Sequence, residues 1–330
     1  MDLDLKDRKL LYYLDKNSRS SLTDLARNLR TSKEVVHYRI KKLLEEGIIK
    51  KFYTIINTTK LGFVSHKIYL QFQRMSKEKE AELLSYLRTH PKVFWIATCS
   101  GKWDLMIGTW ATDIIDFNDH VLEGILNRFS DYILNKDITI TKHNRQWSRR
   151  WFYSENGRII TSDVGGRPEK LKLDRIDEEI LKILANNARM PIVEIARRIK
   201  STPMVVNYRI KQLKKKGVIL SFRIALDLQK FDYEFVKAFV YLQNINTEKE
   251  REFISYCMRD KNILNVVTVV GSWDLEIEFE IESFEKFHGI MREVREKFGG
   301  IIKNYESVLI SEEPRVDFMP GCYPVFGLKK

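Results

Sequence analysis

Two short segments, residues 32–46 and 202–216, carry the side chains with the clearest chemistry. Apolar residues recur in each at positions i, i+4 and i+7, as at Val36, Ile40 and Leu43, which predicts a helix with one buried face. The opposite face would present donors, acceptors and an aromatic ring, which suit base edges and phosphates in the major groove of double-stranded DNA. The predicted DNA-binding residues on these faces are Lys33, Glu34, His37, Tyr38 and Lys41, and Met204, Asn207, Tyr208 and Lys211.

Arg39 and Arg209 lie on the same two predicted helices, and two roles are open for each. A guanidinium group there can contact a DNA phosphate, and on that basis both residues join the predicted DNA-binding set. It can equally bridge to a carboxylate of its own module, such as Asp24 or Glu194.

The two segments occupy equivalent positions in a tandem duplication. A shift of 170 residues superimposes one half on the other, and Gly101 to Leu105, for example, matches Gly271 to Leu275. Such a period is far too long for a solenoid repeat. We therefore expect one protein-sized fold that occurs twice in the chain.

Each copy begins with a basic segment. Residues 1–52 contain 13 basic against 8 acidic residues, a net charge of +5, and residues 171–222 contain 12 against 5, a net charge of +7. The whole chain carries +12, so the positive charge is concentrated where the DNA-binding helices are predicted. That distribution favours a polyanionic partner over a uniformly solvated surface.

The basic segment predicts three helices followed by a short strand. Asp4 is expected to cap the first helix, Ser20 the second and Ser32 the third, and the third is expected to end at Gly47. In the second copy, Pro191 and Thr202-Pro203 mark the corresponding helix starts, and Gly217 the end. Residues 48–56 and 218–226 have β character and are each predicted to form a wing.

The rest of each copy has the order strand, helix, strand, strand, helix, strand. In the first copy the strands are expected at residues 67–73, 94–99, 105–110 and 132–142, and the helices at 77–88 and 114–129. The second copy repeats the pattern from residue 236 to 310. This order predicts a ferredoxin-like βαββαβ domain with two helices on one face of an antiparallel sheet.

The complete pattern resembles the Lrp/AsnC family of regulators, the leucine-responsive and asparagine-synthetase type. The resemblance rests on Asp7, Leu11, Asn17, Arg19, Leu25-Ala26, Ser32, Val36, Arg39-Ile40, Leu43 and Gly47-Ile48-Ile49, on their counterparts in the second copy, and on the two Gly-x-Trp-Asp turns. It implies an α+β fold with two copies of a winged helix-turn-helix and a ferredoxin-like ligand-sensing and dimerisation domain. The expected domains are 1–56, 57–145, 173–226 and 227–315, with a linker at 146–172 and a tail at 316–330.

The resemblance also implies a sequence-specific, DNA-binding transcriptional regulator that responds to an amino acid or a related small effector. Gly101, Asp104, Gly271 and Asp274 are the effector-binding residues that it carries over. A glycine and an aspartate are also what a tight turn between two strands requires, so a purely structural role is an alternative.

Residues 143–153 interleave arginines with aromatic residues, as nucleic-acid-binding segments often do. The alternative is a continuation of the preceding strand that packs its aromatic rings, which we favour. Residues 163–168 contain Gly165-Gly166 and Pro168 and are predicted to form a mobile linker.

Duplication allows both partners of a dimer to come from one chain, as an intrachain pseudo-dimer. Pairing between chains, in a homo-oligomer, is equally compatible with the sequence. The two predicted recognition faces differ, so we expect a preference for asymmetric operators.

Two other functions are alternatives for a chain of this build. Sirohaem decarboxylases share this build and occur as fused pairs, but their chemistry needs ionisable groups around a porphyrin, and no histidine recurs at the 170-residue offset. A nucleoid-organising protein with little sequence preference is the third possibility.

The remaining sequence features mostly exclude classes of protein and kinds of site. No stretch has the apolar length of a membrane span or the pattern of a signal peptide, so a cytoplasmic, nucleoid-associated protein without a membrane partner is expected. Cys99, Cys257 and Cys322 have no paired spacing, which predicts free thiols. We predict no metal site, no catalytic residues and no cofactor.

Overall fold

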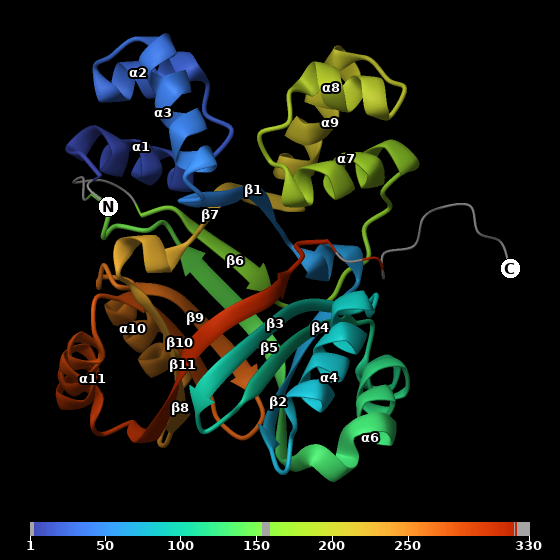
Figure 1. Cartoon of the computed structure of the whole chain (residues 1–330), viewed down its shortest axis with the longest axis vertical. Helices are drawn as coiled ribbons and strands as arrows, with labels where there is room; N and C mark the ends of the chain where they lie inside the picture. Colours follow the sequence, from blue (N-terminus) through green and yellow to red (C-terminus); the bar gives the residue numbers. More distant parts are fainter. Residues whose placement is uncertain (1–2, 154–158, 320, 322–330) are drawn as a thin grey trace, which may run out of the picture.

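The computed structural model describes residues 3–153, 159–319 and 321. Figure 1 shows two helical modules side by side above a closed body of strands that has helices on its outer sides. We call these modules head one, residues 3–56, and head two, residues 173–226. The predicted tail, residues 316–330, lies largely outside the described residues, and Cys322 lies there too.

Each head is built from three helices. They are α1 (Leu5–Lys16), α2 (Leu22–Leu29) and α3 (Lys33–Glu45) in head one, and α7 (Arg175–Asn186), α8 (Ile192–Arg198) and α9 (Pro203–Lys215) in head two. The predicted caps at Asp4, Ser32 and Thr202 are confirmed, because each side chain accepts a hydrogen bond from a backbone N–H of the first turn. The second helix of head one begins one residue later than predicted, with Ser21 as its cap.

The strands predicted as wings are confirmed, and they pair with each other across the two copies. Strand β1 (Ile49–Ile56) does not form a hairpin within its own copy but pairs antiparallel with β7 (Ile219–Leu226) of the other copy. Tyr53 lies opposite Arg223, its equivalent after a shift of 170 residues. The two strands therefore form one shared ribbon, with the pseudo-twofold axis of the chain passing near this pair. Gly47 and Gly217 enter the ribbon with φ of 70° and 69°, a conformation that glycine adopts without strain.

The rest of each copy has the predicted ferredoxin-like order. Copy one contributes β2 (Val64–Phe72), α4 (Lys77–Thr89), β3 (Val93–Gly101), β4 (Leu105–Ala111), a helical segment made of α5 (Ile114–Phe117), a π-helical turn (Asn118–Leu122) and α6 (Glu123–Phe129), and β5 (Ile133–Trp147). Copy two contributes β8 (Glu234–Leu242), α10 (Thr247–Cys257), β9 (Ile263–Val270), β10 (Leu275–Ile281), α11 (Phe284–Phe298) and β11 (Ile302–Val316). Short 3-10 turns at Thr58–Leu61 and Leu228–Phe231 connect each head to its first strand.

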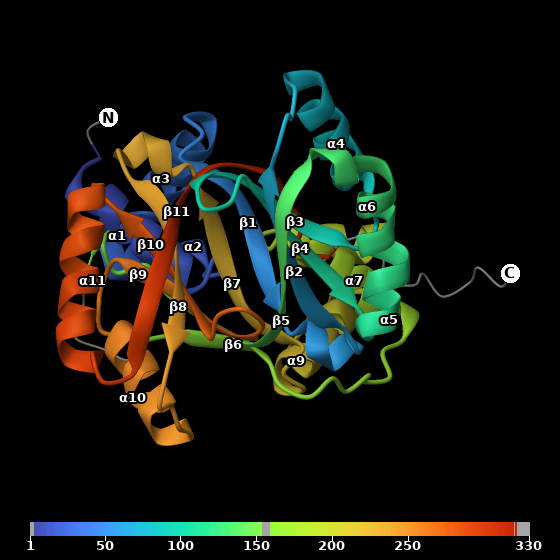
Figure 2. The same cartoon turned by 90° about the horizontal axis from the view of Figure 1, so that it is seen from below.

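The two sheets close into a barrel. The strand order is β2-β4-β3-β11-β8-β10-β9-β5, and β5 also pairs with β2. Two seams between copies, β3 with β11 and β5 with β9, complete the ring. Figure 2 shows the helices of the two copies on opposite outer sides of this ring. Closure leaves no free edge among these eight strands, so the copies pair within one chain.

The apolar cores follow this division. Helices α4 and α6 cover the sheet of copy one over Ile68 and Ile107, while α10 and α11 cover the sheet of copy two over Ile277 and Phe279. A third cluster, with Tyr69, Trp103, Phe239 and Trp273 among its members, joins residues of both copies.

The segment between the copies is more ordered than predicted. Trp147, Trp151 and Phe152 are buried, which confirms the packing alternative for the aromatic stretch. Residues 163–165, predicted to be mobile, belong instead to strand β6 (Thr161–Gly165), which pairs with the end of β5. The prediction failed because an edge strand can accept glycine where its partner backbone approaches closely, and a Cβ at Gly165 would lie 2.2 Å from the carbonyl oxygen of Lys142.

Candidate nucleic-acid interface

The free face of α3 carries the predicted DNA-binding side chains. Val36, Ile40 and Leu43 are buried against α1 and α2. Lys33, Glu34, His37, Tyr38 and Lys41 are exposed. Tyr38 is 65% exposed, and the Lys41 side chain is 66% exposed and forms only a surface ion pair with Glu45. This face therefore has no partner within head one that would keep DNA away.

Helix α9 presents an equivalent face with different chemistry. Met204, Asn207, Tyr208 and Lys211 are exposed, and Met204 reaches 80%. Head one has the acid Glu34 where head two has Met204, and His37 where head two has Asn207. Asn donates and accepts hydrogen bonds at once and suits adenine, whereas the acceptor-only Glu34 suits the amino group of cytosine. The two faces are thus unequal in the groups that would contact base edges.

Arg39 and Arg209 are held inside their heads. Arg39 donates to Asp7 at 2.7 Å and pairs with Asp4 at 2.9 Å, while Arg209 pairs with Asp174 at 2.7 Å. The predicted carboxylate partners, Asp24 and Glu194, are wrong, because Asp24 pairs with Arg27 and Glu194 with Arg197 and Arg198.

These arginines connect the recognition helix to the start of the first helix. Partial burial opposes ionisation of Asp4, but the amide of Asp7 and the guanidinium of Arg39 lower the pKa of Asp4 below its usual range. We therefore assign Arg39 and Arg209 a positioning role, which differs from direct phosphate contact.

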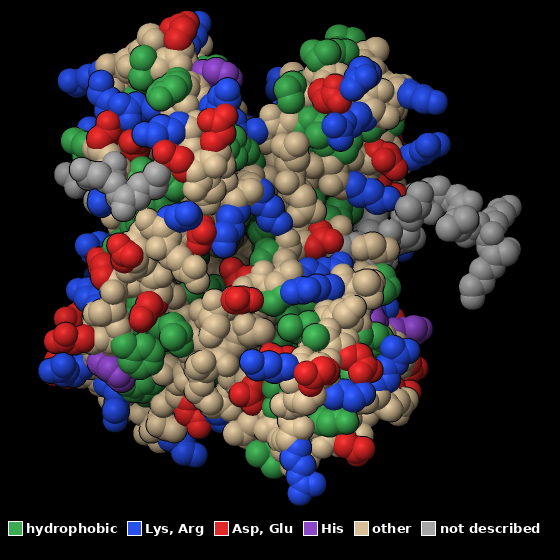
Figure 3. Space-filling model, in the orientation of Figure 1, with side chains coloured by type: hydrophobic (Ala, Val, Ile, Leu, Met, Phe, Trp, Pro, Cys, Tyr) green, Lys and Arg blue, Asp and Glu red, His purple; other side chains and the backbone are tan. Residues whose placement is uncertain are grey.

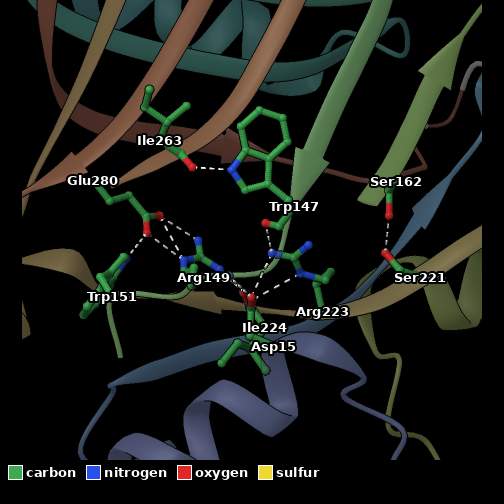
Figure 4. Close-up of polar contacts among 10 residues, drawn as sticks. All are labelled: Asp15, Trp147, Arg149, Trp151, Ser162, Ser221, Arg223, Ile224, Ile263 and Glu280. Atoms are coloured by element: carbon green, nitrogen blue, oxygen red, sulfur yellow. Dashed lines mark hydrogen bonds and ion pairs between the residues drawn. The ribbon is translucent and has the colours of Figure 1, made fainter. Parts of the chain in front are cut away.

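A buried charge network ties head one to the barrel and to the ribbon (Figure 4). Asp15 of α1 pairs with Arg149 at 2.9 Å and with Arg223 of β7 at 2.8 Å, and Arg149 pairs with Glu280 of β10 at 2.8 Å. The neighbouring carboxylates raise the pKa of Arg149 although burial opposes this. The network fixes where head one sits.

Sequence reasoning missed this network. The equivalents of Asp15, Arg223 and Glu280 are Ala185, Tyr53 and Trp110, so the network has no counterpart in the other half. Charged residues at strand and helix positions that are apolar in the other copy were the available signal.

The predicted effector residues form two tight turns between strands. The Asp104 carboxylate accepts from the Phe72 amide at 2.6 Å, and the Asp274 carboxylate from the Leu242 amide at 2.7 Å. Gly101 has φ of 132°, and a side chain there would meet the Ser307 carbonyl oxygen. Gly271 packs in the same way on the backbone of Ile138 and Thr139. All four residues therefore have a structural role, which is to form the two tight turns beside the seams of the barrel.

Three further features of the described residues concern metal binding, membrane spans and cysteines. The described residues contain no group of three or more His, Cys, Asp or Glu residues placed to hold a metal ion. None of the helices in the described ranges has the length and apolarity to cross a membrane. Cys99 and Cys257 are buried free thiols, and burial raises the pKa of Cys99 to about 12.

Comparison with known proteins identifies both heads. A family model described as winged helix-turn-helix DNA-binding matches residues 3–50 and 173–219. An uncharacterised HTH-type transcriptional regulator of Pyrococcus furiosus is 32% identical over 122 residues, which are 37% of this chain and 81% of that protein. Another from Pyrococcus abyssi is 33% identical over 145 residues, 43% of this chain and 94% of that protein.

Among solved structures, the siroheme decarboxylase NirDL matches over nearly the whole chain. The two share 14% sequence identity with a TM-score of 0.63, and the match covers 96% of this chain and 94% of that one. At this identity the likeness shows a common fold of two heads and two sheet domains. Since HTH-type regulators of 32–33% identity match one half of the chain over 81–94% of their own length, the protein belongs to the HTH-type transcriptional regulators, with two winged helix-turn-helix copies fused in tandem.

Proposed function

We propose that the protein regulates transcription by binding operators with its two unequal recognition faces. The observation that carries the proposal is the exposure of both helices, α3 and α9, on heads that one covalent chain holds together. Figure 3 shows Lys and Arg side chains on both heads and a notch between them. Lysines on these faces would supply salt-dependent phosphate affinity, and the other side chains would choose the sequence.

The proposed base-reading and phosphate-contacting set is the predicted one without the two arginines. It consists of Lys33, Glu34, His37, Tyr38 and Lys41 in head one, and Met204, Asn207, Tyr208 and Lys211 in head two. Because the faces differ, the two half-sites of the preferred operator should differ as well. Such a regulator would act in the cytoplasm on nucleoid DNA.

Selection of bound duplexes from a random pool tests this proposal. We expect a site with two dissimilar halves, and a variant in which Glu34 and His37 are replaced by the residues of head two, Glu34→Met with His37→Asn, should shift one half only. Recovery of perfect inverted repeats by the unaltered protein would contradict the proposal. Equal binding of all duplexes would favour a nucleoid-organising role.

We further propose that a small effector, such as an amino acid, modulates binding. The binding residues we propose for it are those that the family resemblance implies, Gly101, Asp104, Gly271 and Asp274, which lie near the seams between copies. Both aspartates already accept backbone hydrogen bonds, so an effector there would have to use their second oxygen atoms or the neighbouring backbone. Assembly into larger homo-oligomers is a further part of this proposal.

Tetrapyrrole chemistry is the second candidate, and the fold shared with NirDL favours it. Spectrophotometric titration of the purified protein with an iron uroporphyrin separates the two functions. A shifted Soret band with release of carbon dioxide would support an enzyme. Absence of both, together with specific DNA binding, would leave the regulator.

A further inference from the structure

A cavity of about 450 Å³ lies between the β1–β7 ribbon and the open end of the barrel. This volume is in the range typical of pockets for small molecules, roughly 300–1,000 Å³. Both copies line it, and Figure 3 shows a recess in the middle of the face where the heads meet the barrel. The site is separate from the Gly-x-Trp-Asp turns, none of whose residues lines it.

The cavity is not symmetric although the fold is duplicated. Glu278 and Glu280 line it from β10, and their equivalents in β4 are Gly108 and Trp110. Trp95 in β3 corresponds to Asn265 in β9. A homodimer of identical chains would place the same group on both sides of its axis, whereas the fused chain places acids on one side and aromatic rings on the other. Divergence at these positions fits a site built for one unsymmetrical ligand.

Most charges around the cavity are neutralised within the protein. Glu280 pairs with Arg149, and Glu278 pairs with Lys237 at 2.9 Å. Lys67 pairs with Glu276 at 2.6 Å. These groups shape the wall but leave little charge for a ligand to balance.

Glu313 and Lys51 also line the cavity, but they are not neutralised by a direct ion pair of this kind. Within the described part of the chain, neither has an ion-pair partner within 4 Å. The Glu313 carboxyl accepts from Trp95 Nε1 at 2.7 Å, and Lys51 Nζ donates to Asn186 Oδ1 at 3.2 Å and to the Val316 carbonyl. Glu313 is an exposed residue that lines the cavity, and desolvation by the surrounding protein raises the pKa of its carboxyl group, against the hydrogen bond from Trp95 that lowers it. Burial likewise lowers the pKa of Lys51. One acid and one base of the same cavity thus form no direct ion pair, although the charges of Asp317 and Glu313 act on Lys51 from farther away and that of Lys50 acts on Glu313.

The cavity is also lined by neutral polar side chains with atoms that have no hydrogen-bond partner among the described residues. Asn265 is only 6% exposed; its amide donates to Glu278 at 2.7 Å, but its Oδ1 has no partner among the described residues. Thr141 Oγ1 and Asn144 Oδ1 are buried without partners in the same part of the molecule. Buried polar atoms normally have hydrogen-bond partners, so these atoms indicate a polar occupant.

We propose that this cavity binds a small zwitterion, with its ammonium group at Glu313, its acid group at Lys51, and an apolar or aromatic body against Phe94 and Trp110. These two rings stack with centroids 5.1 Å apart and form an apolar wall. Charge-assisted hydrogen bonds at both ends would set the orientation of the ligand.

The position of the cavity links its occupancy to DNA binding. Lys50, Lys51 and Tyr53 belong to the ribbon, which continues directly from α3 through Gly47. A ligand that contacts ribbon and barrel together favours one placement of the heads over others. This regulatory consequence rests on the proposed function, whereas ligand binding itself does not.

Calorimetric titration of the full chain tests the site, with L-tryptophan, L-phenylalanine and L-leucine as probes. Each is compared with its amine and acid analogues, such as tryptamine and indole-3-propionate. We expect at least one zwitterion to bind about tenfold or more tightly than both analogues. Glu313→Gln should remove the preference for the zwitterion over the acid analogue, and Lys51→Met the preference over the amine.

Glu312→Gln, an exposed change on the adjacent residue, is the matched control and should leave the titration unchanged. Circular dichroism establishes that each variant is folded. Should Lys51→Met disturb the ribbon, the Glu313→Gln data decide the question alone.

Three results would overturn the inference: no zwitterion binds, Glu313→Gln binds as the parent does, or Asp104→Ala and Asp274→Ala abolish binding that Glu313→Gln leaves intact. The last result would place the ligand at the turns and preserve the proposed function. Loss of DNA binding with retained ligand binding would instead remove the proposed function and keep the site.

Discussion

Arg19 and Arg189 are equivalent residues of the two copies, and each anchors itself to the other head. Arg19 donates to the carbonyl of Met190 at 3.0 Å, and Arg189 donates to the carbonyl of Ser20 at 3.1 Å. Two backbone hydrogen bonds also join the heads. The Ser18 N–H donates to the Phe222 carbonyl and the Ala188 N–H donates to the Phe52 carbonyl, both at 2.9 Å. The heads are thus locked to each other around the pseudo-twofold axis, which sets the spacing that an operator must match.

Replacing Arg19 by alanine should destabilise the protein. Burial lowers the pKa of Arg19, which shows that the guanidinium group is desolvated and depends on its carbonyl partners. Its loss leaves carbonyl groups of Ala188 and Met190 without donors, and we expect a decrease of about 2 kcal/mol in the free energy of unfolding. Urea denaturation measures it. Arg27→Ala, an exposed change on α2, should cost less than about 0.5 kcal/mol; equal losses would contradict the anchoring role.

Removing Lys41 or Lys211 should weaken binding to all DNA sequences by a similar factor. Each lysine is exposed on a recognition face and is proposed to contact a phosphate. In fluorescence anisotropy, each Lys→Ala change should reduce the slope of log K against log salt by about 1. Lys77→Ala on α4, at the outside of the barrel, is the control, and an unchanged slope in Lys41→Ala would remove that residue from the interface.

Asn207→Ala should affect specificity more than general affinity. Its amide can bond two positions of one adenine, so we expect a loss of about 1–3 kcal/mol at one half-site and little change elsewhere. Competition between the preferred operator and duplexes altered in one half measures this. A uniform loss over both halves would show that Asn207 does not contact bases.

Asp15→Asn should be strongly destabilising, since it leaves Arg149 and Arg223 buried with less compensating charge. Removing one partner of a buried ion pair typically costs about 3–5 kcal/mol. Thermal unfolding of Asp15→Asn and of the exposed control Asp24→Asn provides the comparison. A small effect at Asp15 would mean that the network does not hold head one in place.

Glu276 should make stability depend on pH in the acid range. Burial alone would raise the pKa of Glu276, but the ammonium groups of Lys237 and Lys67 lower it to about 2, from an ordinary value of 4.5. A carboxyl group whose pKa is lower in the folded state than in the unfolded state contributes its full stabilisation of the fold at pH values above its unfolded-state pKa. This contribution, about 3 kcal/mol, is then lost as pH falls from about 5 to 2.

Urea denaturation at several pH values, with Glu276→Gln beside the parent, measures this term. The variant should be less stable at neutral pH and should show a flatter pH dependence. Glu82→Gln on the exposed face of α4 serves as the control. Parallel pH profiles for parent and Glu276→Gln would refute the assignment.

The sequence alone determined the features that depend on local chemistry and on periodicity. Helix caps at Asp4, Ser32 and Thr202, the buried stripe through Val36 and Ile40, and the strand and helix order of both sheet domains follow from spacings within a few residues. The 170-residue repeat added the equivalence of the two copies. Exposure of Lys41 and Lys211 was predicted in the same way, from the side of the helix on which they lie.

Tertiary structure decided everything that involves residues far apart in the chain. The pairing of β1 with β7, the closure of the barrel and the strand at 161–165 all depend on backbone groups that complete their hydrogen bonds with another segment of the chain. The partners within the network of Asp15, Arg149, Arg223 and Glu280, and the absence of a direct ion pair at Glu313 and Lys51 among the described residues, likewise follow only from the fold. The reason is physical, since the charge of a side chain is local but its desolvation and its counter-ions depend on which distant segments the fold brings beside it.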